Sequence, residues 1–224
     1  MSVVFPPLYA IIDPSLLTTS VLSFAEIMAE SGVQLLQYRD KYAATRQVFD
    51  MSNLLSHRLS SPARTEARSV RFIVNDRPDI ALLVGAGGVH VGQTDLGVEQ
   101  ARAILGREPW VGVSTHTLDQ VEAADRTSAD YLAFGPMFPT ATKEQADPVV
   151  GLRLLAQARA RTSKPLVAIG GITLERAADT YRAGADSLAV ARDLLASPNP
   201  GARARAFLEE AARVGRAEGS TRPI

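Results

Sequence analysis

The chain has 224 residues with 24 basic and 24 acidic side chains, so its formal net charge is zero. Such a balance lacks the surplus of cations that displaces counterions from nucleic-acid phosphates, so a general nucleic-acid-binding role is excluded. No apolar run reaches the ~18 residues of a membrane span. The absence of cysteine excludes disulfides and a cysteine nucleophile. We therefore expect a globular, cytoplasmic protein without nucleic acid or membrane as partner; a homo-oligomer is compatible with the sequence.

Short β-rich runs alternate along the chain with segments in which apolar residues recur every three or four positions. Strands are predicted at residues 8–13, 35–39, 72–75, 88–91, 111–114, 131–135, 166–170 and 187–191. Helices are predicted between them, for example at 98–105, 152–161 and 174–183. A helix between consecutive strands demands parallel pairing. Eight such units predict a single-domain α/β fold, a (β/α)8 TIM barrel over residues 1–216 with a flexible tail at 217–224. An open, doubly wound sheet is the alternative.

Three polar residues at alternating positions accompany the end of the second predicted strand: Gln37, Arg39 and Lys41. Successive side chains of a strand point to opposite faces, so these three share one side while Leu36 and Tyr38 face the helices. The carboxyl ends of barrel strands hold the active site, and two cations there are costly to desolvate without an anion. A phosphate or diphosphate is the expected ligand. The alternative is a structural salt bridge to Asp40 or another acid.

Two carboxylates follow the next two strands. Asp76 lies directly after the third predicted strand, and Asp95 lies four residues after the fourth. Adjacent strand ends would bring them together, and Mg²⁺ is commonly held by one or two carboxylates together with substrate phosphate oxygens. Each Asp could instead cap the helix that follows it. The neighbouring Arg and Lys favour the metal site.

Further polar groups follow the later strands. After the fifth strand, the hydroxyls of Ser114, Thr115 and Thr117 could cap the next helix or bind phosphate, and His116 is expected to hydrogen-bond to Asp119. The loop after the sixth strand carries a second set of anion-binding groups: Thr140, Thr142 and Lys143.

The seventh strand ends in Gly170-Gly171, where bare backbone N–H groups can approach a phosphate at the usual barrel site between the last two loops. The mouth of the barrel therefore contains two anion sites and one metal pair. These features predict a transferase or lyase that acts on phosphorylated substrates.

Seven motifs, in order and at barrel spacing, resemble those of the thiamine-phosphate synthases. They are LYAIID at 8–13, QYRDK at 37–41, NDR at 75–77, GVHVGQTD at 88–95, GVSTHT at 112–117, FGPMFPTATK at 134–143 and AIGGI at 168–172. The resemblance implies a (β/α)8 transferase that joins a hydroxymethylpyrimidine diphosphate to a thiazole phosphate. It implies a dissociative mechanism: diphosphate leaves, a pyrimidine-methyl cation forms, and the thiazole nitrogen captures it.

Site residues follow from the resemblance by matching position. The residues implied for the pyrimidine diphosphate are Gln37, Arg39, Lys41, Asn75, Ser114 and Lys143, of which Arg39, Lys41, Ser114 and Lys143 form the catalytic set. Mg²⁺ would be the cofactor, held by Asp76 and Asp95. The groups implied for the thiazole phosphate are Thr140, Thr142, Gly171 and the backbone of Ala191 and Arg192.

One position departs from the family pattern, because Arg192 stands where the family usually has a serine. Its side chain is expected to contact the thiazole phosphate, and the alternative is an outward ion pair with Asp193 or a helix carboxylate. Two other functions remain as alternatives for the chain: a thiazole tautomerase-like isomerase, and a non-catalytic barrel that binds a phosphorylated ligand.

Overall fold

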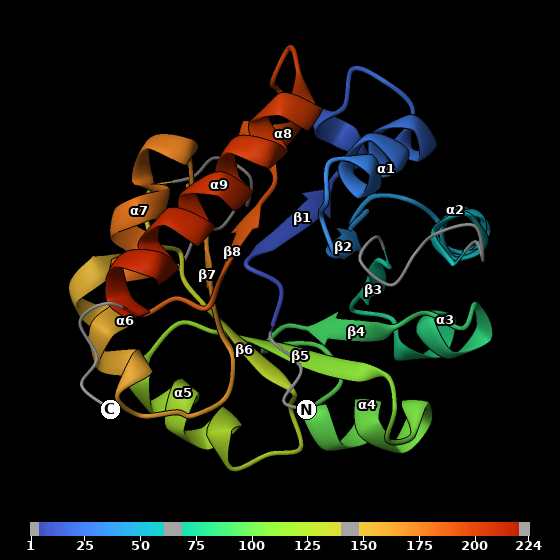
Figure 1. Cartoon of the computed structure of the whole chain (residues 1–224). Coiled ribbons are helices and arrows are strands. Elements are labelled where there is room, and N and C mark those ends of the chain that lie inside the picture. The colour runs from blue at the N-terminus through green and yellow to red at the C-terminus, as the bar shows by residue number, and fades with distance from the viewer. Residues whose placement is uncertain (1–4, 61–68, 140–147, 220–224) are drawn as a thin grey trace.

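A computed structural model of the chain describes residues 5–60, 69–139 and 148–219. Eight parallel strands pair in chain order and close into a barrel (Figure 1). The strands are β1 Leu8–Ile12, β2 Leu35–Tyr38, β3 Arg71–Asn75, β4 Gly88–Val91, β5 Trp110–Thr115, β6 Tyr131–Phe134, β7 Leu166–Ile169 and β8 Ser187–Val190. Each lies within one residue of its predicted bounds. Because β8 pairs with β1, the open-sheet alternative is wrong.

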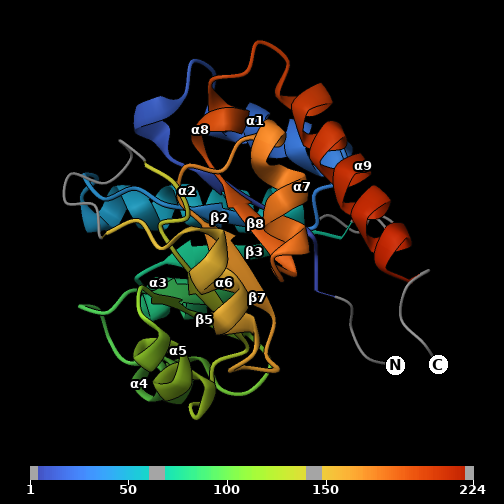
Figure 2. The ribbon, with the colours of Figure 1, turned by 90° about the vertical axis from the view of Figure 1, so that its left-hand side faces the viewer.

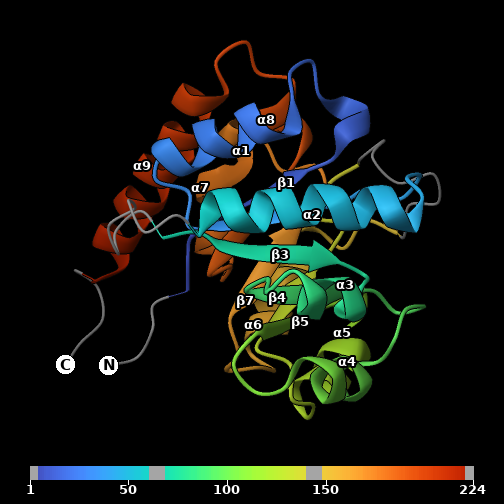
Figure 3. The ribbon, with the colours of Figure 1, turned by 90° about the vertical axis from the view of Figure 1, so that its right-hand side faces the viewer.

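Helices surround the barrel on its outer face (Figures 2 and 3). They are α1 Val21–Glu30, α2 Thr45–Leu59, α3 Pro78–Leu83, α4 Val98–Leu105, α5 Leu118–Asp125, α6 Gly151–Arg159, α7 Leu174–Arg182, α8 Arg192–Leu195 and α9 Pro200–Gly219, with a short 3-10 helix at Pro14–Leu16. Helix α9 packs against α1 and α7 and so closes the ring of helices (Figure 2). It continues to Gly219, three residues beyond the predicted end of the barrel domain at 216. No helix in the described ranges is long and apolar enough to cross a membrane.

Strand alternation divides the buried core into two layers. The outward-facing residues, among them Leu36 and Tyr38, pack under the helices as predicted. The inward-facing residues fill the barrel interior: Tyr9, Ile11, Leu35, Ile73, Tyr131, Ala133, Val167 and Ala189. Burying a large apolar side chain contributes about 1.5–3 kcal/mol, so both layers stabilise the barrel. At Gly112 a Cβ would overlap the Tyr131 ring, so the absence of a side chain on β5 makes room for this tyrosine.

Aromatic rings cover the amino-terminal end of the barrel. The Phe5 ring stacks on Trp110 with centroids 5.1 Å apart, and it also lies 5.3 Å from the ring of Tyr131. The Arg71 guanidinium lies over the Trp110 ring, 4.0 Å from the ring centroid. A cation over an indole face is attracted by the ring quadrupole. The opposite end of the barrel, where the strands terminate, remains open.

Candidate active site

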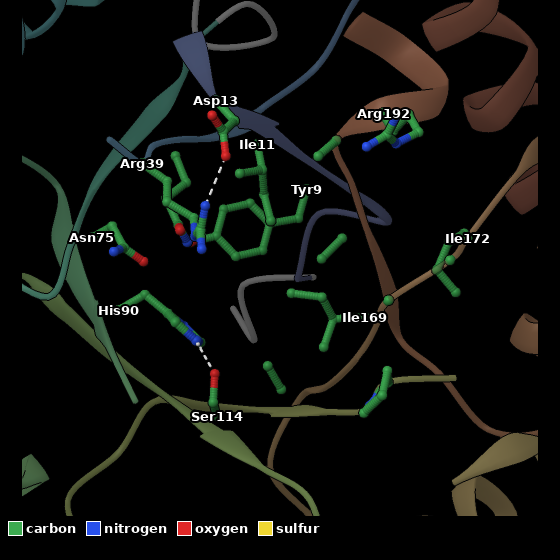
Figure 4. Close-up of a pocket in the computed structure, with 18 of the residues that line it drawn as sticks. Tyr9, Ile11, Asp13, Arg39, Asn75, His90, Ser114, Ile169, Ile172 and Arg192 are labelled. Atoms are coloured by element: carbon green, nitrogen blue, oxygen red, sulfur yellow. Dashed lines mark hydrogen bonds and ion pairs between the residues drawn. The ribbon is translucent and has the colours of Figure 1, made fainter. Parts of the chain in front are cut away.

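A cavity of about 1150 Å³ opens at the carboxyl ends of the strands (Figure 4). All of the predicted site residues that lie in the described ranges line it: Gln37, Arg39, Lys41, Asn75, Asp76, Asp95, Ser114, Gly171, Ala191 and Arg192. The parallel barrel explains this convergence, because every strand delivers its last residues to the same end. Thr140, Thr142 and Lys143 lie outside the described residues.

Both predicted cations that follow β2 form ion pairs with acids in the cavity wall. Arg39 donates from Nη1 to Oδ2 of the buried Asp13 at 2.7 Å (Figure 4), and the Lys41 ammonium pairs with Asp76. Asp40 is the partner of neither cation, and its Oδ1 accepts from the backbone N–H of Tyr42 at 3.1 Å. The structural salt bridges offered as the alternative therefore exist, with acids other than Asp40. Because these acids lie in the cavity wall, both cations remain at the cavity.

The two carboxylates of the predicted metal pair lie side by side. Burial raises the pKa of the Asp76 carboxyl; the Lys41 ammonium opposes this shift, and the adjacent Asp95 carboxyl adds to it. Asp76 has a φ of 59°, a left-handed conformation that Asp tolerates better than most residues. Such strain is found at functional sites.

Neither carboxylate caps a helix. The N-cap residues of α3 and α4 are Arg77 and Gly97, so the capping alternative for Asp76 and Asp95 is wrong. Asp95 instead accepts from the backbone N–H of Gly92 at 2.7 Å, which holds its carboxylate in the loop. Within the described residues no group of three or more His, Asp or Glu side chains is placed to hold a metal. The two carboxylates match the small number that Mg²⁺ uses when substrate oxygens complete its shell.

The hydroxyls at the end of β5 and just after it have separate roles. Thr117 caps α5 by accepting from Gln120 N at 3.2 Å, and the buried Thr115 donates to the Ala133 carbonyl at 3.0 Å. Ser114 faces the cavity. His116 bonds through Nδ1 to the Gly135 carbonyl at 2.6 Å. The expected bond from His116 to Asp119 is therefore wrong in its partner, because β6 lies beside β5 and brings Gly135 closer.

The turn after β7 is shaped by two glycines. Gly170 and Gly171 have φ values of 95° and 64°, and a Cβ on Gly171 would lie 2.8 Å from the Pro139 carbonyl oxygen. Arg176 braces the turn by donating to the Gly171 carbonyl at 2.6 Å, with its guanidinium 4.5 Å from the Phe138 ring centroid. The backbone at this turn can thus approach a ligand that a side chain would exclude.

Arg192 begins α8 on the β8 side of the cavity, opposite Asn75 (Figure 4). Its side chain is exposed and makes no hydrogen bond or ion pair with the described residues. The alternative pair with Asp193 is wrong, because Asp193 accepts from Arg203 through Nε at 2.8 Å and Nη2 at 3.0 Å. The Arg192 charge is therefore available at the cavity.

Sequence reasoning missed a hydrogen-bonded chain inside the barrel. Gln37 Nε2 lies 2.5 Å from the Tyr9 hydroxyl, which lies 3.0 Å from the Tyr131 hydroxyl. His90 links Tyr131 to Ser114, with Nδ1 3.1 Å from the phenol oxygen. Its Nε2 lies 2.9 Å from Ser114 Oγ (Figure 4). Burial raises the pKa of both phenols, so they are neutral at physiological pH. The alternation of side chains along each strand could have predicted that these residues point inward, but it could not have predicted that they contact one another.

The fold is a (β/α)8 barrel with a polar cavity at the carboxyl ends of its strands. A family model described as thiamine monophosphate synthase matches residues 8–194. The chain therefore belongs to the thiamine monophosphate synthase family.

Named relatives agree with this assignment. The chain is 46% identical over 211 residues to the thiamine-phosphate synthase of Koribacter versatilis, covering 91% of this chain and 95% of the relative. It is 38% identical over 203 residues to that of Methanospirillum hungatei, covering 90% and 96%. Among solved structures, thiamine phosphate pyrophosphorylase from Pyrococcus furiosus matches with a TM-score of 0.81 at 28% identity, covering 93% of this chain and 96% of that one. The family membership and these relatives support thiamine-phosphate synthase activity, a transferase reaction of thiamine biosynthesis.

Proposed function

We propose that the chain joins a hydroxymethylpyrimidine diphosphate to a thiazole phosphate, giving thiamine monophosphate and free diphosphate. The observation that carries this proposal is the division of polar groups within one cavity. Cations and the carboxylate pair gather at the ends of β2 to β4, whereas the Gly170–Gly171 turn and Arg192 lie at the ends of β7 and β8. One cavity can therefore hold a diphosphate and a separate phosphate at the same time.

The proposed chemistry is dissociative. The C–O bond between the pyrimidine methylene and the diphosphate breaks, and the electron pair leaves with the diphosphate oxygen. The thiazole nitrogen then donates its lone pair to the methylene carbon, forming the C–N bond. Arg39 and Lys41 would stabilise the charge on the departing diphosphate, and Lys143 is expected to join them. Charge stabilisation and alignment suffice for such a reaction, so no protein nucleophile is required.

Asp76 and Asp95 would hold Mg²⁺ in this proposal. Their oxygen donors suit a hard cation. Burial is the main cause of the raised pKa of Asp76, the adjacent Asp95 carboxyl adds to it, and a bound cation would stabilise both ionised carboxylates. When bound, Mg²⁺ would neutralise charge on the leaving diphosphate. Lys41 already pairs with Asp76, so the ammonium lies at the edge of the same group of charges.

Diphosphate release from the two substrates, measured with and without Mg²⁺, tests the proposal. We expect release to require both substrates and the metal, and to fall strongly in Asp76→Asn and Asp95→Asn. Asp50→Asn is the matched control, because Asp50 pairs with Arg46 at 2.9 Å on the exposed surface of α2. Full activity of both cavity variants in excess chelator would refute the metal assignment. Isomerisation of a thiazole phosphate without diphosphate release would instead support the tautomerase alternative.

A further inference from the structure

The hydrogen-bonded chain in the barrel interior runs from Gln37 through Tyr9, Tyr131 and His90 to Ser114, and Tyr131 is the member that does not line the cavity. Gln37 and Ser114 lie in the cavity wall, as do Tyr9 and His90. Tyr131 lies beneath them, fully buried, with its hydroxyl between Tyr9 and His90. Any change in the direction of its hydrogen bonds therefore reaches both ends of the chain.

The donors and acceptors of this chain can be assigned in order. The amide nitrogen of Gln37 can only donate, so the Tyr9 oxygen accepts from it. The fully buried Tyr9 hydroxyl then needs an acceptor for its own hydrogen, and the Tyr131 oxygen at 3.0 Å supplies it. Tyr131 in turn donates to His90 Nδ1.

With Nδ1 accepting, the proton of the His90 imidazole lies on Nε2 and is donated to Ser114 Oγ. The Ser114 hydrogen is then left to point into the cavity. The reverse direction would make Tyr131 donate to Tyr9 and leave the Tyr9 hydrogen without an acceptor among the described residues. Such an unsatisfied buried donor costs about 1–3 kcal/mol, so the first direction is favoured.

The packing around Tyr131 is specific to this arrangement. A Cβ at Gly112 would overlap the tyrosine ring, so β5 carries no side chain at the one place where the phenol crosses the barrel. The ring of His90 stacks on that of Tyr131 at 5.5 Å with an interplanar angle of 28°, which holds the imidazole plane. The phenol therefore has little freedom to turn away from its two partners.

We propose that Tyr131 is a positioning residue that fixes the hydrogen-bonding direction of the cavity floor. Through His90 it makes the Ser114 hydroxyl a donor into the cavity, and through Tyr9 it leaves the Gln37 amide oxygen as an acceptor. One donor and one acceptor complement an aminopyrimidine edge, which presents a ring nitrogen beside an amino group. This match to the pyrimidine rests on the proposed function, whereas the direction of the chain does not.

Two measurements on Tyr131→Phe test the inference, with Tyr181→Phe as the matched control. Tyr181 is also a buried tyrosine and loses one hydrogen bond, a donation to the Pro7 carbonyl at 2.9 Å, but it does not line the cavity. The first measurement is the ¹⁵N chemical shifts of the His90 imidazole. We expect the Nε2–H tautomer in the wild-type protein and in the control, and loss of that preference in Tyr131→Phe.

The second measurement is steady-state kinetics. In Tyr131→Phe we expect KM for the pyrimidine diphosphate to rise about tenfold, equal to about 1.4 kcal/mol, with KM for the thiazole phosphate unchanged. A proton on Nδ1 of wild-type His90 would overturn the inference even if the variant failed to fold. An unchanged pyrimidine KM in folded Tyr131→Phe would overturn it too. Absence of diphosphate release by the wild-type enzyme would refute the proposed function alone, since the tautomer measurement needs no substrate.

Discussion

Removing the Arg192 side chain gives the sharpest test of the thiazole-phosphate site. Arg192 is exposed at the first position of α8 and makes no ion pair with the described part of the chain. A charge-assisted hydrogen bond contributes about 1.5–3 kcal/mol, and solvent exposure reduces this toward the lower value. We therefore expect Arg192→Ala to lose about 1.4 kcal/mol of phosphate binding, a tenfold rise in KM for the thiazole phosphate.

The assay combines KM values for both substrates with the melting temperature. KM for the pyrimidine diphosphate and Tm should change little in Arg192→Ala, since no side-chain hydrogen bond or ion pair within the described residues is lost. Arg203→Ala provides the contrast, because Arg203 makes two bonds to the Asp193 carboxylate, whose side chain is only 15% exposed. Losing them should cost about 1–2 kcal/mol, or about 2–8 °C in Tm for a chain of this size. An unchanged thiazole KM in active Arg192→Ala would refute the side-chain contact.

Three further predictions concern stability and catalysis. Burial and the neighbouring carboxyl raise the pKa of Asp76, so its ionisation destabilises the fold as pH rises through that pKa. Asp76→Asn in chelator should therefore melt at or above the wild-type temperature at pH 7, with the difference vanishing below about pH 3.9; a lower Tm at pH 7 would contradict this. Gly112→Ala should lower the free energy of unfolding, measured in urea, by about 1–3 kcal/mol through overlap with Tyr131. Gly215→Ala is the control: nothing lies within 4 Å of its Cβ position, so the free energy of unfolding should not fall. Lys143→Ala should lose about 3–4 kcal/mol of transition-state stabilisation with an unchanged Tm; lost Tm with normal turnover would instead indicate a structural role.

The barrel fold and the residues that line its cavity could be predicted from the sequence, because both depend on local sequence pattern. Strand periodicity places Gln37 and Arg39 on the inner side, and parallel pairing brings their strand ends to one edge. The partners could not be predicted, because they depend on register between strands. Ile12 pairs with Tyr38, which sets Asp13 beside Arg39 rather than leaving that cation to Asp40.

The hydrogen-bonded chain in the barrel interior could be predicted from the sequence even less. Tyr9 and Tyr131 are 122 residues apart, and their contact exists only because the barrel is closed and narrow. The only local signal for it is a glycine at 112, and a glycine within a strand can indicate a bulge or a close approach equally well. Long-range hydrogen bonds of this kind require the assembled barrel before they can be identified.

In the described part of the chain, the stacked rings of Phe5 and Trp110 lie at the amino-terminal end of the barrel, and the cavity opens at the other end. Tyr9 and His90 line the cavity on the side where a ligand would bind, and Tyr131 lies buried beneath them. A ligand that fills the cavity therefore covers Tyr9 and His90, and it excludes water from the hydrogen-bonded chain in the barrel interior. Electrostatic interactions strengthen as water is excluded, so a ligand that fills the cavity would strengthen the interactions of the charges that line it.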